Sequence, residues 1–189
     1  MLTLMSDLSR HLPLSSRPRG DESGVTGDWR EAVAEVVSQA AALSPSPEDA
    51  AEFLRASGLL RNVPATALGE VAAAVRTGPR RRIRALSDAV RALLVLAGER
   101  EVDLPPVTSG AVALYAATRM PFERRAALSG TSVRAADADW TFGRGPVRVA
   151  PARVILEFVL ALSDTPPPLA PRDGHPESDG PQPPRTSSR

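Results

Sequence analysis

The sequence predicts a mainly α-helical protein: a helical bundle, then a small α+β unit made of a short β-hairpin and a closing helix. Three observations support this fold class. Apolar residues recur at helical spacing through most of the chain between residues 27 and 120. Hydrophobic residues make up 42% of the chain but aromatic residues only 4%, which suits a shallow helical core better than a large β-sandwich. After residue 130 the pattern changes to short β-branched and aromatic runs separated by Asp and Gly.

Composition divides the chain into four segments. Residues 1–26 are polar and rich in Ser, Arg and Gly, whereas residues 164–189 are dominated by Pro and polar residues. Such compositions bury too little apolar surface to offset the entropy lost on ordering, so we expect a disordered tail at each end. Between the tails we expect the helical bundle at 27–120 and the α/β unit at 121–163.

The first two helices of the bundle have start signals in the sequence. Asp28 precedes the first helix, and Glu31 follows three residues later as a capping-box partner. One face of this helix carries the apolar residues Trp29, Val33, Val36, Val37 and Ala40. Ser46 is expected to cap the second helix, with Pro47 at its first position and an end near Gly58.

Three further helices are expected to complete the bundle. The third covers residues 65–76, and the fourth covers roughly 82–97, where apolar residues have the strongest helical spacing. Gly98 ends the fourth helix. The fifth begins after Pro105-Pro106, and Pro121 interrupts it before a short turn, "FERRAAL".

The segment "TSVRAADADWTFGRGPVRV" predicts two or three short strands. The residues expected to build this unit are Asp137, Asp139, Trp140, Gly143, Gly145 and Pro146. Trp140 serves as a large anchor between the hairpin and the bundle, and the two glycines permit the turn. A last helix starts at Pro151 and is expected to point Val154, Ile155, Phe158, Val159 and Leu162 inward.

Catalytic side chains are scarce in this sequence. The chain has no cysteine and two histidines, His11 and His175, which both lie in the predicted tails. The central domain therefore lacks an imidazole base, a thiolate and the usual zinc ligands. The remaining candidates for acid–base chemistry or a hard cation are the carboxylates Glu99, Glu101 and Asp103, with Asp137 and Asp139. We interpret them first as solvated helix-end and turn residues and assign no metal ligand.

The only concentrated positive charge is formed by Arg80, Arg81, Arg82 and Arg84. Contact with an anion or a nucleic-acid backbone is one interpretation of this run. Against it, the run opens a helix, where positive charge opposes the helix dipole, and no aromatic residues are interleaved for stacking. The net charge of +1 also gives no field that would steer the whole protein to nucleic acid. A solvated corner between helices is therefore the favoured interpretation.

No apolar run approaches the ~20 residues that span a bilayer. The first 20 residues also lack the continuous apolar core of a signal peptide. We therefore expect a cytoplasmic protein without membrane contact, and the sequence leaves its oligomeric state open.

Residues 120–162 resemble the C-terminal part of the actinobacterial maleylpyruvate isomerase family of mycothiol-dependent enzymes. The similar features are an Arg-rich turn at Arg124-Arg125, a strand ending at Asp139-Trp140, a Gly-x-Gly-Pro turn at 143–146, and Pro151-Ala152 before an aliphatic helix. The resemblance implies a DinB-like bundle in front of this unit. That bundle is expected to be truncated or altered here, because the family's usual N-terminal segment has no match before residue 60.

The resemblance also implies a chemistry. Enzymes of this family bind a divalent metal through bundle histidines and a carboxylate, and they use mycothiol to isomerise a cis double bond in small dicarbonylic acids. This chain departs from that pattern, because "EDAAEFLRAS" offers no histidine and Ala97 stands where a ligand would. We therefore expect no cofactor. Mycothiol and zinc belong only to the hypothesis that the protein is an enzyme.

Three functions follow as hypotheses. The favoured one is a non-catalytic family member that acts as a binding or interaction domain for a protein or small molecule. The second is an active metal- and mycothiol-dependent isomerase or transferase with an unusual carboxylate site at Glu99, Glu101 and Asp103. The third is a nucleic-acid-associated regulator that uses Arg80–Arg84. Convergence of Glu99, Glu101 and Trp140 on one pocket would favour a ligand, and scatter would favour a scaffold.

Overall fold

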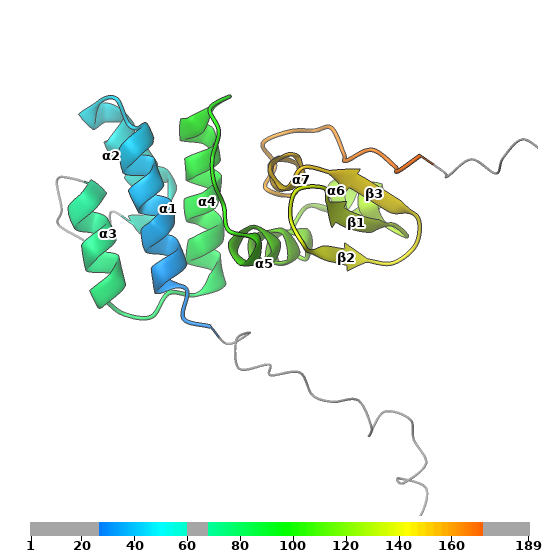
Figure 1. Cartoon of the computed structure of the whole chain (residues 1–189), viewed down its shortest axis with the longest axis horizontal. Helices are drawn as coiled ribbons and strands as arrows, with labels where there is room; N and C mark the ends of the chain where they lie inside the picture. The colour runs from blue at the N-terminus through cyan, green and yellow to red at the C-terminus, as the bar shows by residue number, and fades with distance from the viewer. Residues whose placement is uncertain (1–26, 60–67, 172–189) are drawn as a thin grey trace, which may run out of the picture.

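A computed structural model describes residues 27–59 and 68–171 of the chain (Figure 1). The predicted fold class is confirmed: this part contains seven helices and one three-stranded sheet, with a closing helix after the last strand. The predicted N-terminal tail, residues 65–67 of the predicted third helix and residues 172–189 of the predicted C-terminal tail lie outside the described residues. Within the described ranges, no helix combines the length and the apolar character needed to cross a lipid bilayer.

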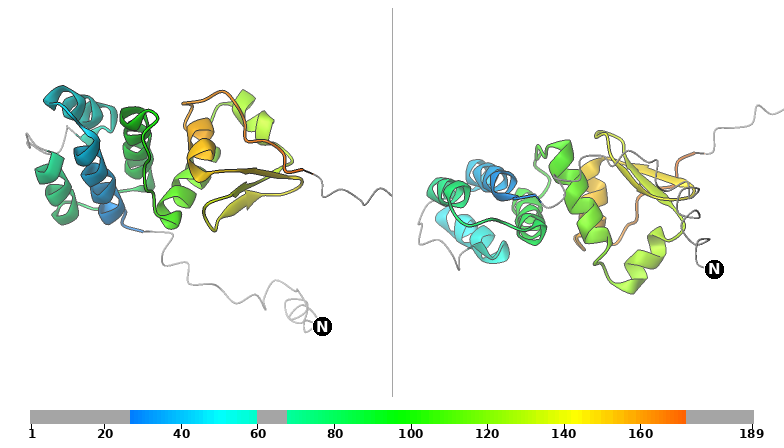
Figure 2. Two further views of the ribbon diagram at one scale, coloured as in Figure 1. Left: turned by 45° about the horizontal axis from the view of Figure 1, so that its top comes forward. Right: turned by 90° about the horizontal axis from the view of Figure 1, so that it is seen from below.

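Four helices pack together in one half of the molecule, and a fifth lies across them and leads to the other half (Figures 1 and 2). These helices are α1 (Arg30–Leu43), α2 (Pro47–Ala56), α3 (Leu68–Thr77), α4 (Ile83–Ala97) and α5 (Pro106–Ala117). Their buried aliphatic residues belong to one continuous core that also includes Ile155 and Phe158 of the C-terminal unit. The two halves are therefore held together by apolar burial.

Local signals in the sequence set the boundaries of α2 and α4. The Ser46 hydroxyl accepts a hydrogen bond from the Asp49 N–H at 3.2 Å, and Pro47 occupies the first helical position. Gly98 follows the last residue of α4 with a φ of 58°, a backbone conformation that glycine adopts at little cost. These features agree with the predicted ends of both helices.

The start of α1 differs from the predicted capping box. Asp28 accepts hydrogen bonds from the backbone N–H of Arg30 and of Arg81, both at 3.2 Å, so it joins α1 to the segment before α4. Desolvation acts to raise the pKa of Asp28, but these hydrogen bonds and the Arg30 side chain together hold that pKa below its ordinary value. Glu31 pairs instead with Arg76 of α3 at 2.9 Å. Glu31 thus pairs with a residue of another helix and not with the start of its own helix, and the local sequence pattern could not show this.

The sheet is built from β1 (Ser132–Ala135), β2 (Thr141–Gly143) and β3 (Val147–Ala150). Its spatial order is β2-β1-β3, with β2 antiparallel and β3 parallel to the central strand β1. The predicted hairpin is therefore the β1–β2 pair. The third strand returns to the opposite side of β1 after the Gly-Arg-Gly-Pro turn.

The predicted C-terminal tail begins too early. Residues 165–171 run along the outer side of β3, where the Pro168 carbonyl accepts from the Val149 N–H at 3.0 Å and Ala170 N–H donates to the Val147 carbonyl at 2.7 Å. Proline suits a sheet edge because it needs no hydrogen bond from an N–H of its own. A composition argument counts buried apolar surface and misses such backbone pairing.

Two short helices, α6 (Phe122–Leu128) and α7 (Ala152–Val159), complete the C-terminal unit. The segment predicted as a turn, "FERRAAL", is the helix α6, because Pro121 precedes it as a helix-starting residue instead of only ending α5. Val154 was expected to point inward, but it is 38% exposed, since it lies on the outer face of the short α7. Ile155, Phe158 and Val159 are buried as expected.

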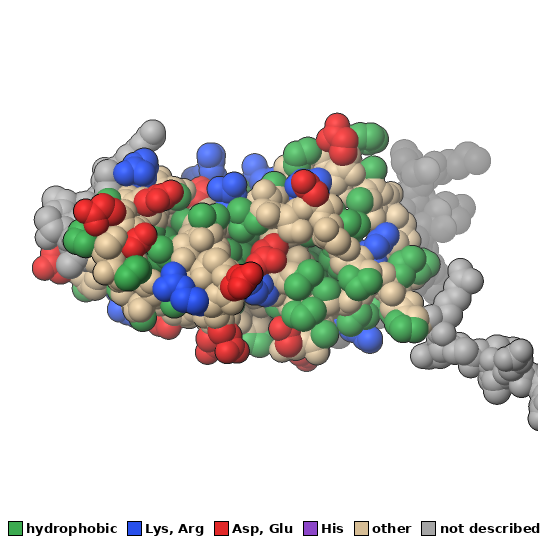
Figure 3. All heavy atoms as spheres, turned by 90° about the horizontal axis from the view of Figure 1, so that it is seen from above, with side chains coloured by type: hydrophobic (Ala, Val, Ile, Leu, Met, Phe, Trp, Pro, Cys, Tyr) green, Lys and Arg blue, Asp and Glu red, His purple; other side chains and the backbone are tan. Residues whose placement is uncertain are grey.

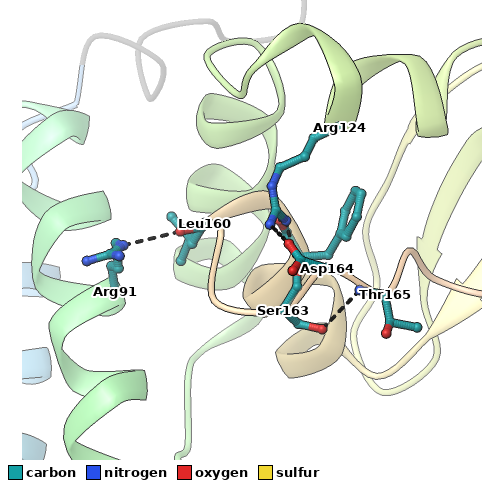
Figure 4. Close-up of polar contacts among 7 residues, drawn as sticks. Arg91, Arg124, Leu160, Ser163, Asp164 and Thr165 are labelled. Carbon is teal, nitrogen blue, oxygen red and sulfur yellow. Dashed lines mark hydrogen bonds and ion pairs between the residues drawn. The ribbon is translucent and has the colours of Figure 1, made fainter.

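Arginine side chains satisfy the carbonyl groups at the end of α7 (Figure 4). Arg124 of α6 donates to the carbonyl oxygens of Phe158 at 2.9 Å and of Ser163 at 2.6 Å, and it also pairs with Asp164. Arg91 of α4 donates to the Leu160 carbonyl at 3.2 Å. The last carbonyls of a helix have no partner inside the helix, so these contacts fasten α7 to both α6 and the bundle.

Candidate functional site

Three of the five predicted carboxylates, Glu101, Asp103 and Asp137, reach a shared cavity. It has a volume of about 520 Å³ and lies between the segment after α4, the start of α5 and the start of α7. Asp137, from the turn between β1 and β2, lines the same cavity, together with Arg153. Glu99 does not line it. The sequence named all three carboxylates, but in two separate groups. The fold brings Asp137 to Glu101 and Asp103, and it adds Arg153, which was not predicted.

The charged residues on the inner side of this cavity already have structural partners. The Asp137 carboxylate accepts the Ala152 N–H at 2.7 Å and so caps the start of α7. Arg153 donates to the carbonyls of Gly98 and Arg100 at the end of α4 and pairs with Glu157 at 2.8 Å. Glu101 and Asp103 remain as exposed carboxylates of the group.

No three His, Cys, Asp or Glu side chains are grouped closely enough to hold a metal ion in residues 27–59 and 68–171. This holds for the cavity with Glu101, Asp103 and Asp137 as well.

Trp140 lies away from this cavity and packs on α5. Its indole Nε1 donates to the hydroxyl of the buried Ser109 at 3.0 Å. Gly110 faces the ring so closely that an added Cβ would lie 3.0 Å from the indole. Phe142 stacks nearly parallel to Trp140, with ring centroids 6.2 Å apart and planes 13° apart. Glu99, Glu101 and Trp140 therefore do not converge on one pocket.

A second concave surface lies where Trp140 and Phe142 meet α5, and we call it the α5–β2 groove. Its volume is about 320 Å³, and it is lined by Pro106, Val107, Gly110, Ala111, Leu114, Asp139, Trp140, Thr141 and Phe142. Asp139 is the one charged residue in this lining. Val107 is 74% exposed and Leu114 is 55% exposed, so α5 presents aliphatic side chains to solvent here. In the view of Figure 3, hydrophobic side chains gather mainly on the half of the molecule that carries the sheet.

The groove was not predicted, although one of its two walls, the helix α5, has an unusual sequence. The helix α5, "PVTSGAVALYAA", contains no charged residue, and a helix that is apolar on every side needs burial all round. Its inner face, with Val112 and Ala113, is fully buried, but the outer face is not. The neighbouring aromatic pair comes from residues about 30 positions later, and no local pattern connects the two.

The strand β2 adds an open sheet edge beside the groove. The Ala135 N–H donates to the Trp140 carbonyl at 3.2 Å, which sets the alternation of the antiparallel ladder. The backbone groups of Thr141 and Gly143 consequently point away from β1. In the part of the chain that the structure describes, no strand pairs with this outer side, whereas residues 168–170 cover the outer side of β3.

The arginine run lies between α3 and α4, at the start of α1. Arg80, Arg82 and Arg84 are exposed, whereas Arg81 is half-buried, and its carbonyl accepts the Trp29 N–H at 3.0 Å. Arg84 lies 3.8 Å from Asp88, whose pKa is raised by partial burial against the opposing attraction of nearby arginines. One arginine therefore has a structural role, and binding of nucleic acid by the others stays a prediction.

Comparisons with protein-family models, with curated proteins and with solved structures found no match for this chain. The resemblance of residues 120–162 to the maleylpyruvate isomerase family stays a prediction.

Proposed function

We propose that the chain is an interaction domain that binds an apolar protein segment in the α5–β2 groove. In this proposal it is a divergent, non-catalytic member of the mycothiol-dependent maleylpyruvate isomerase family. The observation that carries the proposal is the exposure of Val107 and Leu114 beside the stacked pair Trp140 and Phe142. Contiguous apolar surface of this kind is typical of sites that bind another polypeptide.

The edge of β2 suits an extended partner. A segment that adds to this edge would pair with the outward backbone groups of Thr141 and Gly143. Successive side chains of an extended segment point to opposite sides, so every second one would lie over the groove. Backbone pairing would supply affinity, and the aliphatic and aromatic lining would select apolar side chains.

The separation of the candidate residues supports binding over catalysis. Trp140 is held by Ser109 and α5, and Asp137 and Arg153 are engaged in capping helices. A catalytic group needs to reach a reacting atom together with its partners. Asp137 and Trp140, which belong to the motif that resembles the isomerase family, therefore make contacts that hold the fold together.

Substitution of Leu114 tests the groove. Random peptides displayed on phage are selected against the chain, and the affinities of the selected peptides are measured by titration. We expect apolar peptides whose affinity falls at least about tenfold with Leu114→Asp, because burial of one leucine contributes about 1.5–3 kcal/mol. Val95→Asp is the matched control, since Val95 on α4 is also 55% exposed but lies outside the groove. Equal binding to both variants would contradict the proposal.

The enzyme hypothesis is kept as a second candidate because Glu101, Asp103 and Asp137 line one cavity, although they are not grouped closely enough there to hold a metal ion as the side chains stand. If this cavity binds a catalytic metal, purified protein will take up one equivalent of zinc, and Glu101→Gln with Asp103→Asn will abolish that uptake. Under the interaction proposal we expect sub-stoichiometric zinc that these two substitutions do not change. Metal analysis after dialysis against a zinc-containing buffer distinguishes the two outcomes.

A further inference from the structure

We infer that the partner at this site is a second copy of the chain, which pairs antiparallel with the open edge of β2 and joins the two sheets into one. This inference rests on the proposed function and names the partner that the same site binds. It follows from the open edge of β2, from the register in which two such edges fit each other, and from the charges at the two ends of the strand.

The sheet has one covered edge and one open edge. At the edge of β3, residues 168–170 exchange backbone hydrogen bonds with Val147 and Val149. At the edge of β2, which Figure 1 shows on the outer side of the sheet, no strand is paired within the described residues. Many proteins block such an edge with a proline or a charged side chain on the strand. The sequence of β2, Thr141-Phe142-Gly143, contains neither, so the edge is open to another strand.

Two copies of β2 fit each other in one antiparallel register. The outward backbone groups of β2 belong to Thr141 and Gly143, whereas those of Phe142 point to β1. With a two-fold axis at Phe142, Thr141 of one copy lies opposite Gly143 of the other. The Gly143 N–H of each copy then donates to the Thr141 carbonyl of the other, and the symmetry makes this bond twice. A shift by one residue would place these groups opposite Phe142, whose backbone is already turned to β1.

Phe142 brings an aromatic ring to the groove of the other copy. Its ring lines the α5–β2 groove and stacks on Trp140. In the inferred register the two Phe142 residues lie directly opposite each other without a mutual hydrogen bond, which is the closer of the two kinds of antiparallel pair. Directly opposed side chains lie on the same face of a sheet, so each Phe142 ring extends the aromatic wall of the other copy's groove. The pairing thus removes apolar surface from water as well as satisfying the open edge.

The charges at the two ends of β2 are complementary in this arrangement. Asp139 lies before the strand and Arg144 directly after it; both are exposed, and neither forms an ion pair within the described residues. Antiparallel pairing sets Asp139 of each copy beside Arg144 of the other, whereas parallel pairing would bring like charges together. Of the other charged residues nearby, Asp137 and Arg148 are engaged in hydrogen bonds of their own, and Arg134 lies one strand further from the axis. The antiparallel dimer therefore gains two pairs of opposite charge.

The interface is small, so we expect a weak dimer. Two strands of three residues with their flanking side chains cover less surface than the roughly 800 Å² per partner that is usual in a stable complex. Interfaces below that size belong to transient complexes. We accordingly expect a dissociation constant of about 10–500 μM.

Exchange of the two charges tests this arrangement. In sedimentation equilibrium of the full-length protein, from about 5 to about 1,000 μM, we expect the average mass to rise toward that of two chains. Asp139→Arg and Arg144→Asp each turn two attractive pairs into repulsive ones, so each should raise the dissociation constant at least about fivefold. An equimolar mixture of the two variants restores both attractive pairs, so association should return. Glu70→Arg is the matched control, because it makes the same change of charge at an exposed residue of α3.

Two results would overturn the inference. One is a chain that stays monomeric over the whole concentration range. The other is a dimer that Asp139→Arg weakens no more than Glu70→Arg does, or that the mixture of variants does not restore. If the chain is monomeric and the peptides selected on phage still depend on Leu114, the proposed function stands and the inference fails. If the charge exchange gives the expected result but Leu114→Asp and Val95→Asp bind those peptides equally, the dimer stands and the proposed function fails.

Discussion

Replacement of Gly145 by alanine is expected to lower the free energy of unfolding by about 2–4 kcal/mol, because two costs add at this position. The φ of Gly145 is +111°, a conformation that residues with a side chain rarely adopt. A Cβ there would also lie 2.1 Å from the carbonyl oxygen of Gly130, a backbone atom that cannot turn away. Relief would require the turn between β2 and β3 to separate from the segment before β1.

Gly130→Ala provides the matched control for this substitution. Gly130 has a positive φ of +69°, but a Cβ added to it meets no atom within 4 Å. It therefore isolates the conformational cost, which we expect to be about 1 kcal/mol. Thermal and denaturant unfolding of both variants measures the difference. Equal losses of stability in the two variants would show that the contact with the Gly130 carbonyl contributes nothing.

The glycine pair also shows how far a sequence pattern reaches. "GRGP" predicted a turn after the aromatic strand, and a turn is present between β2 and β3. The contact that makes Gly145 irreplaceable lies 15 residues earlier, at Gly130, and exists only because β3 returns parallel to β1. Local conformation was predictable here, whereas the close approach of two segments was not.

The same division holds for the helices. Ser46-Pro47 and Gly98 act on their own helix, so their effects could be predicted from a few neighbouring residues. In contrast, Asp28 accepts a hydrogen bond from the N–H of Arg81, 53 residues away. The segment 165–171 is held by backbone hydrogen bonds to the outer edge of β3. Propensity and periodicity describe an isolated segment, so they cannot predict hydrogen bonds to residues that are distant in the sequence.

The candidate site divides in the same way. Glu101 and Asp103 were found because they follow the end of α4 in sequence, but Asp137 joins their cavity by capping α7. The α5–β2 groove could have been suspected from the uncharged sequence of α5 alone. Its second wall, Trp140, was predicted as a packing anchor. The sequence cannot distinguish a tryptophan whose ring is fully buried from one whose ring leaves a face open to solvent.

Replacement of Arg124 is the second substitution with a large expected effect. The Arg124 side chain is only 18% exposed and satisfies the carbonyls of Phe158 and Ser163 while its guanidinium lies 5.3 Å from the centre of the Phe158 ring. Arg124→Ala removes these contacts together: the Ser163 carbonyl loses its donor, and the Phe158 carbonyl keeps only the backbone N–H of Ala161. Each hydrogen bond from a charged donor contributes about 1.5–3 kcal/mol, so we expect a total loss of about 2–4 kcal/mol.

Two matched variants identify the cause of that loss. Arg125→Ala changes the neighbouring residue of α6, whose exposed side chain makes no hydrogen bond or ion pair with the described residues, so it should cost less than about 0.5 kcal/mol. Arg124→Lys keeps the charge but lacks the planar guanidinium that reaches two carbonyls at once, and its loss should fall between the others. Denaturant unfolding followed by circular dichroism gives the three values. If Arg124→Lys is as stable as the unaltered protein, charge alone holds the end of α7, and the paired carbonyl contacts are not what joins α6 to it.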